Sequence, residues 1–246
     1  MQVGTSGALD ADPPRSTPIP GRKHYAFARY CHPGRWESYY VQLRETLDLA
    51  PQSVLEIGVG DGFFGSYLRR LGVDYRSIDI LGDLKPDIVA SMTHLPLEAA
   101  SFDVVCAFQV LEHLRWHDVP IALAELARVA RRYVLISLPH AGPYFQFALK
   151  VPLFPPIRMV AKIPWPIRNY ADPEHFWEVG KIGFSRRSVR ALLKRQFRIK
   201  NELLVFGFPY HRFYILEVSD FDPVHRGERE KLRLGQYEVS DEDGTW

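Results

Sequence analysis

The sequence has few cysteines, little net charge and no long apolar run. Cys31 and Cys106 are the two cysteines in 246 residues, and neither belongs to a disulfide framework or a zinc-ligand spacing. This usage is typical of a reducing cytoplasm, where we expect the protein to work. The formal net charge is +2, so no overall basic field indicates a nucleic-acid partner. No uncharged apolar run reaches about 18 residues, so no membrane-spanning helix is expected.

The composition predicts one large domain between two polar ends. Hydrophobic residues make up 46% of the chain and charged residues 24%, which is enough to bury a full core. Residues 1–22 are rich in Gly, Pro, Ser, Thr and Asp and lack the apolar segment of a secretory signal, so a disordered leader is expected. The domain is expected at 23–218, followed by a charged tail at 219–246.

Strand-like and helix-like segments alternate along the domain. This alternation predicts a Rossmann-like α/β fold with a doubly wound, mostly parallel sheet. The last two strands are separated by Gly207 and Pro209, so they are expected to pair antiparallel and to place an antiparallel strand near one edge. Strands are expected at 53–57, 74–80, 88–90, 102–108, 133–138, 197–205 and 213–218, and helices at 35–49, 62–71, 119–130 and 185–196.

A glycine-rich turn follows the first expected strand and opens a helix. The segment 56–62 reads EIGVGDG, so Gly58, Gly60 and Gly62 occupy alternate positions after Glu56. Glycine lets the backbone turn tightly and approach a ligand without a Cβ clash. Ligands of such sheets bind beyond the carboxyl ends of the strands, so this turn is a candidate cofactor site.

The spacing and charge of the turn distinguish between cofactors. The dinucleotide fingerprint is Gly-x-Gly-x-x-Gly, whereas glycines alternate here. Carboxylates at Glu56 and Asp61 are unfavourable beside a pyrophosphate but suit a cofactor with a sulfonium and an ammonium group. Asp79 ends the second strand, twenty-one positions after Gly58, where an acid can accept hydrogen bonds from ribose hydroxyls. An ordinary strand-to-helix turn would not explain this acid.

These residues resemble the class I S-adenosylmethionine-dependent methyltransferases, in particular the small-molecule methyltransferase branch. The resemblance runs from about residue 53 to 139 and more loosely to 218. It implies that the turn of Glu56, Gly58, Gly60 and Gly62 binds the cofactor, that Asp79 binds its ribose, and that Ile80 flanks its adenine.

Two later segments carry the resemblance further. The stretch SMTHLP at 91–96 matches the segment before the family's fourth strand, and 101–114 matches that strand and its LEHL ending. The resemblance places Ser91, Met92 and Phe108 among the cofactor contacts. Many members have an aspartate where this chain has Ser91, and a serine hydroxyl is a weaker acceptor than a carboxylate.

The resemblance implies methyl transfer from S-adenosylmethionine to a small-molecule, glycan or lipid-linked acceptor. The alternatives are a non-catalytic S-adenosylmethionine-binding or interaction protein, and a protein or nucleic-acid methyltransferase. The last is disfavoured because no recognition domain is visible and the Asn/Asp-Pro-Pro-aromatic motif does not follow the fourth strand. Which atom accepts the methyl group stays open, since one fold serves many substrates.

Three histidines are candidate bases or acceptor-site residues: His113, His140 and His175. A histidine can take a proton near neutral pH without a large pKa shift. The alternative for each is a loop or capping histidine with a structural hydrogen bond. Glu112 and His113 are adjacent metal-ligand types, but that pair alone does not define a metal site, so no metal is predicted.

Two regions beside the sheet are expected to shape the site. Tyr25, Tyr30 and Trp36 either cover the cofactor or pack on the outer helices. The segment between residues 125 and 172 has seven Lys and Arg residues and no acid. It includes most of the insertion expected at about 141–182, which is also rich in apolar residues. Prolines divide its part at 143–170 into short helical or extended pieces. That part is a cap with its own small core, a surface for peripheral contact with anionic membranes and amphipathic acceptors, or a dimer interface. The oligomeric state stays open.

Overall fold

A computed structural model of the chain describes residues 22–169 and 175–218. The expected leader, apart from its last residue, and the expected tail lie outside the described residues. Within the described ranges, no helix is both long and apolar enough to cross a membrane.

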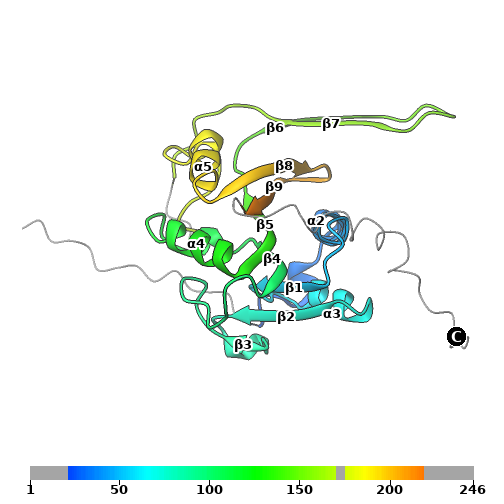
Figure 1. The fold of residues 1–246 in the computed structure, drawn as a ribbon. Coiled ribbons are helices and arrows are strands. Elements are labelled where there is room, and N and C mark those ends of the chain that lie inside the picture. The colour runs from blue at the N-terminus through cyan, green and yellow to red at the C-terminus, as the bar shows by residue number, and fades with distance from the viewer. Residues whose placement is uncertain (1–21, 170–174, 219–246) are drawn as a thin grey trace, which may run out of the picture.

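Seven strands form the central sheet, and the order across it is β3-β2-β1-β4-β5-β9-β8 (Figure 1). The first five strands pair in parallel, whereas β9 is antiparallel to both of its neighbours. The predicted Rossmann-like sheet with an antiparallel strand near one edge is therefore confirmed. The strands are β1 (Ser53–Ile57), β2 (Asp74–Asp79), β3 (Ile88–Val89), β4 (Phe102–Phe108), β5 (Ala130–Pro139), β8 (Phe197–Val205) and β9 (Phe208–Val218).

Helices cover both faces of the sheet, which is why its central strands are apolar at nearly every position. Side chains alternate along β1: Leu55 packs in the core shared with α4 and α5, and Val54 packs in the core shared with α3. Every residue of β4 is buried. The helices are α1 (Phe27–Tyr30), α2 (Pro33–Leu47), α3 (Phe63–Arg70), α4 (Val119–Val129) and α5 (Arg186–Leu193), with short 3-10 helices η1 (Gly82–Leu84) and η2 (Leu111–His113).

Local capping explains where two helices begin. Ser185 caps α5 as the pattern predicts, because its hydroxyl accepts a hydrogen bond from the Ser188 amide at 3.1 Å. Helix α2 begins two residues before its expected start. Pro33 occupies its first turn, where no amide hydrogen is needed, and His32 Nδ1 accepts from the Arg35 amide.

The connection between the last two strands is shorter than the sequence suggests. Strand β9 begins at Phe208 instead of residue 213, so Pro209 lies inside a strand rather than in a loop. The pairing of β8 with β9 shifts register between Leu204 and Val205, opposite this proline. Proline is tolerated there because an irregular position needs no ladder hydrogen bond.

The insertion forms a long β-hairpin that extends away from the sheet (Figure 1). Its strands are β6 (Tyr144–Leu149) and β7 (Ile157–Lys162), and all six residues of β6 are exposed. The expectation of a cap with its own small core is therefore wrong. Of the short helical or extended pieces expected, the structure has the extended ones. Prolines 152, 155 and 156 fall in the turn, so both flanking segments are free to pair as strands.

We expect the outer hairpin to contribute little to stability, because it buries little apolar surface. Gln146 and Val160 pair in register, so an Asn-Gly turn can join them in place of residues 147–159. This trimmed variant is expected to change the free energy of unfolding by less than about 1 kcal/mol in urea titrations. Leu55→Ala, in the buried core, is the matched contrast and should cost about 2–5 kcal/mol. A comparable loss in the trimmed variant would contradict this expectation.

Candidate active site

A cleft opens where the carboxyl ends of β1, β2 and β4 meet. This is the point where the strand order reverses, with β2 on one side of β1 and β4 on the other. The described N-terminal segment and η2 complete its walls. Seven of the nine predicted cofactor contacts line it: Gly58, Gly60, Asp79, Ile80, Ser91, Met92 and Phe108.

The Asp79 carboxylate fixes the glycine turn to the end of β2. One of its oxygens accepts from the Val59 amide at 2.9 Å, and the other accepts from the Leu81 amide at 2.9 Å. Gly58 has a φ of 85°, and a Cβ there would lie 2.5 Å from a methyl group of Val110. Glycine is therefore required both by the backbone conformation and by the close approach of the chain that follows β4.

Glu56 and Gly62 do not line the cleft. The Glu56 side chain is buried behind the turn, where its carboxyl accepts a hydrogen bond from the Tyr75 hydroxyl. Burial raises the pKa of Glu56 to about 8, against the opposing effect of that hydrogen bond. A carboxyl that keeps its proton at pH 7 adds no negative charge to the turn. Gly62, with a φ of 78°, precedes α3 and has a conformational role.

Ser91 and Met92 occupy the wall beside β3. The Ser91 hydroxyl is engaged with Thr93, at 2.8 Å from its hydroxyl and 3.3 Å from its amide. Met92 is buried in the core, and Ile80 is exposed. The apolar character of this wall therefore comes from Ile80, Leu81 and Leu84, together with the edge of Met92 that reaches the cleft.

The three N-terminal aromatic residues divide between the two expected roles. Tyr25 and Tyr30 line the cleft, and their rings meet edge to face with centroids 4.9 Å apart. The Arg35 guanidinium lies 4.2 Å from the centroid of the Tyr30 ring and holds it in place. Trp36 instead packs against Phe63, with the ring centroids 5.1 Å apart. Two of the three therefore cover the cleft, and the third packs on α3.

The fold brings His113 and His175 together, with ring centroids 5.2 Å apart. His113 ends η2 and lines the cleft. His175 lies behind it, with Nδ1 3.2 Å from a carboxylate oxygen of Glu178 and 3.5 Å from the Tyr210 hydroxyl. Sequence reasoning gave no sign of Tyr210, which lies thirty-five positions from His175, or of Glu178, which lies three positions after His175 but belongs to no motif.

His140 lies apart from this pair. Its Nδ1 accepts a hydrogen bond from Arg212 Nε at 2.7 Å, and its carbonyl oxygen accepts from Lys162. Burial and the charge of Arg212 lower the pKa of His140 to about 3. This imidazole stays neutral near pH 7, so its environment is unfavourable for a general base.

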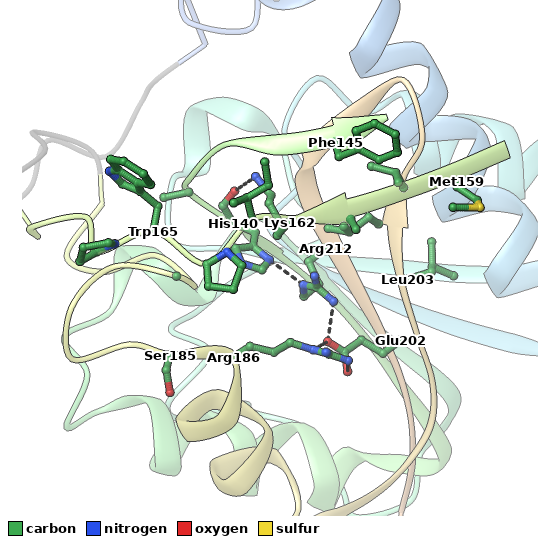
Figure 2. A pocket seen from close by; sticks show the side chains of 18 of the residues that line it. His140, Phe145, Met159, Lys162, Trp165, Ser185, Arg186, Glu202, Leu203 and Arg212 are labelled. Carbon is green, nitrogen blue, oxygen red and sulfur yellow. Dashed lines mark hydrogen bonds and ion pairs between the residues drawn. The ribbon is translucent and has the colours of Figure 1, made fainter. Parts of the chain in front are cut away.

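His140 faces a second cavity, of about 1030 Å³, which lies between the hairpin and strands β8 and β9 (Figure 2). Among the described residues that line this basic cavity, four are cationic, namely Arg158, Lys162, Arg186 and Arg212, and one, Glu202, is a carboxylate. Glu202 pairs with Arg212 at 2.6 Å and with Arg186 at 2.7 Å. Burial and the charge of Arg212 lower the pKa of Lys162 to about 8. The cavity thus carries an excess of positive charge.

Comparisons with known proteins agree with this architecture. Residues 55–136 match the family described as "Methyltransferase domain". The chain is similar in structure to the 1,6-didemethyltoxoflavin-N1-methyltransferase of Burkholderia thailandensis, with 17% identity, 87% of this chain and 99% of that chain covered, and a TM-score of 0.53. It is also similar to the N-methyltransferase NodS of Bradyrhizobium japonicum, with 12% identity and a TM-score of 0.52. This similarity covers 77% of this chain and 89% of that chain.

A third similar structure is an S-adenosylmethionine-dependent methyltransferase of Aquifex aeolicus, at 17% identity, with 78% of this chain and 96% of that chain covered and a TM-score of 0.51. At these identities the likeness establishes the fold. No curated protein matches the chain in sequence. The match over residues 55–136 and the strand order of the sheet both agree with the resemblance to the class I methyltransferases that the sequence indicates.

Glu56 makes the stability of the protein depend on pH. Its pKa is about 8 in the fold and about 4.3 in an unfolded chain, so between these values only the unfolded state has lost the proton. The free energy of unfolding should therefore fall as the pH rises through this window, by an amount on the order of a few kcal/mol. Glu56→Gln cannot ionise and should make that fall shallower in urea titrations across the window, while the buried Glu112, whose pKa burial raises to about 7, keeps its own contribution.

The exposed Glu98 supplies the matched control, since Glu98→Gln changes the same chemical group at the surface. This variant should keep the pH dependence of the parent protein. Equal slopes in the parent and in Glu56→Gln would contradict the burial of a protonated carboxyl behind the turn.

Proposed function

We propose that the protein binds S-adenosylmethionine in the cleft and transfers its methyl group to an acceptor. The observation that carries this proposal is the placement of Asp79 at the end of β2, oriented by two backbone amides beside the glycine turn. An acid held in this way suits the two hydroxyls of a ribose. In support, two of the similar structures contain bound S-adenosylhomocysteine, the demethylated form of this cofactor.

The chemistry needs little from the protein beyond position and exclusion of water. An acceptor atom attacks the sulfonium methyl in line, a new bond to carbon forms, and the carbon–sulfur bond breaks with its electron pair left on sulfur. The reacting atoms must be held about 3–3.5 Å apart in a dry site. Tyr25 and Tyr30 cover the cleft and suit that role, and His113 reaches it from η2.

The acceptor that we propose is amphipathic, with an anionic group linked to a lipid. The basic cavity supplies the charge complementarity, since its described lining residues include four cations and one carboxylate. Tyr210 connects the cavity to the histidine pair. Its carbonyl oxygen accepts a hydrogen bond from the amide of His140, and its hydroxyl lies 3.5 Å from Nδ1 of His175. A small soluble molecule or a glycan with a comparable anionic group would use the same features.

We further propose that the hairpin contacts an anionic membrane surface from the cytoplasmic side. Leu153 at its turn is fully exposed and Phe154 is 66% exposed, and Trp165, which follows β7, is 65% exposed. Lys150 and Arg158 lie among these apolar side chains, and no acid accompanies them. Aromatic anchors with basic neighbours favour the headgroup region, at about 1 kcal/mol per basic residue near an anionic surface.

Titration calorimetry with S-adenosylmethionine and S-adenosylhomocysteine tests the cofactor site. Asp79→Ala is expected to weaken binding roughly 10- to 100-fold, because a charged acceptor of two hydrogen bonds is lost. Asp74→Ala removes an exposed carboxylate from the other end of the same strand and should leave affinity unchanged. Asp79→Asn keeps one acceptor oxygen, so its affinity for the cofactor should lie between those of Asp79→Ala and Asp74→Ala.

A folded parent protein that binds neither form of the cofactor would contradict the proposal. Binding with no turnover on any acceptor pool, including lipid-linked fractions, would instead favour a non-catalytic S-adenosylmethionine-binding protein.

Vesicle co-sedimentation tests the hairpin. The full chain should sediment with phosphatidylglycerol vesicles and much less with phosphatidylcholine vesicles, and added salt should weaken the association. The variant in which Asn-Gly replaces 147–159 should stay in the supernatant while it still binds the cofactor. Equal sedimentation of the two chains, or none by either, would exclude the hairpin as a membrane surface.

A further inference from the structure

We propose that Glu112, His113 and His175 form a binding site for a divalent transition-metal ion in the wall of the cleft. The open coordination positions of this ion would take an oxygen atom of the methyl acceptor. The first part stands on the described residues alone, and the second part rests on the proposed function.

The three side chains converge closely enough to share one ion. One ligand atom from each lies within 4.8 Å of the others. Two ligands bound at about 2.0–2.2 Å on opposite sides of an ion are at most roughly 4.4 Å apart, so small side-chain rotations close the site. The Phe176 amide donates to the Glu112 carbonyl at 2.9 Å, and this bond fixes the segment that carries His175 against η2.

Glu112 is the strongest sign that something is bound here. Its side chain has no exposed surface, and among the described residues neither carboxyl oxygen has a hydrogen-bond partner. A buried carboxyl without partners is costly and requires a physical reason. A divalent cation held with His113 and His175 would satisfy its oxygens and compensate for its burial.

His175 is held in the orientation that metal ligands require. Its Nδ1 lies 3.2 Å from a carboxylate oxygen of Glu178, which is itself buried and paired with Lys181 at 3.0 Å. A metal-binding histidine commonly donates its other ring N–H to a carboxylate, which fixes the tautomer and directs the ring. A neutral His175 that donates from Nδ1 presents Nε2 as an electron-pair donor.

The ligand types select the class of metal. One carboxylate with two imidazoles suits Zn²⁺ and similar first-row ions, whereas Mg²⁺ and Ca²⁺ prefer oxygen ligands. Three protein ligands leave open positions, as catalytic zinc sites do. Because His113 lines the cleft, those positions would face the space that the acceptor occupies.

An acceptor hydroxyl bound to such an ion becomes more acidic, as metal-bound water does. Its proton passes to solvent, and the oxygen, still held by the ion, attacks the methyl group. The oxygen–carbon bond forms while the carbon–sulfur bond breaks with its electron pair on sulfur. The products are a methyl ether, S-adenosylhomocysteine and one proton. His113 and His175 then act as ligands, and no side chain has to serve as general base.

Metal binding can be measured without any acceptor. The full chain, prepared without a histidine tag and stripped with a chelator, would be dialysed against Zn²⁺ or Co²⁺, with bound metal counted by mass spectrometry and the Co²⁺ visible spectrum recorded. One ion per chain is expected. Glu112→Gln, which keeps the side-chain shape, and His175→Asn should each weaken binding by at least about tenfold, and Glu178→Gln by about tenfold through loss of orientation.

His117→Asn is the matched control, because His117 is an exposed histidine near η2. This variant should bind the ion as the parent does, and circular dichroism should show that all variants fold. A parent chain that takes no ion, or unchanged affinity in Glu112→Gln and His175→Asn, would overturn the site. Cofactor titration in parallel separates the two proposals. If the chain binds the cofactor but no ion, the metal site is excluded and the proposed function stands. If it binds the ion but no cofactor, the metal site is supported and the proposed function is not.

Discussion

The hydrogen bonds of the Asp79 carboxylate with two backbone amides are the contact on which the site depends. They hold the turn after β1 against the end of β2 and leave the cleft between them open. The turn can take this place because Gly58 lets Val110 approach to a distance that no Cβ would permit. Val110 leads directly into η2, so the position of Glu112 and His113 follows from the same close approach. The glycine turn with Asp79, the cofactor half of the site, is therefore coupled by backbone geometry to η2. Helix η2, His175, His140 and the basic cavity make up what we propose as the acceptor half.

The two halves differ in how the chain builds them. The β2-β1-β4 half consists of short loops directly after parallel strands, so its residues are near one another in space for topological reasons. The acceptor half depends on β9, which runs antiparallel to β5 and brings Tyr210 and Arg212 beside His140. The antiparallel strand thus does more than finish the sheet, because it links the histidine pair to the basic cavity and the hairpin.

This difference explains which parts of the site could be predicted from the sequence alone. The glycine turn and Asp79 were predictable because a local pattern and a fixed spacing carry them. The burial of Glu56 was not, since it depends on a hydrogen bond from Tyr75 on the neighbouring strand. His175 lies sixty-two positions after His113, and no periodicity connects them. The hairpin escaped prediction because the prolines at 143–170 suggested breaks, whereas three of them lie in its turn and the other three lie just outside its strands.

The charges of the acceptor half favour the binding of an anionic group over proton abstraction by His140. His140 accepts a hydrogen bond from the Arg212 guanidinium and keeps a pKa of about 3, so this side of the site offers positive charge rather than a base. Of the described residues around the basic cavity, Glu202 alone is a carboxylate, and it cannot balance the four cations there. An anionic group bound there would relieve that excess and at the same time direct the rest of the acceptor past Tyr210 toward the pair of His113 and His175. The basic cavity would then recognise the anionic group of the acceptor, and the cleft would activate its reacting atom. Different residues would therefore carry out recognition and activation.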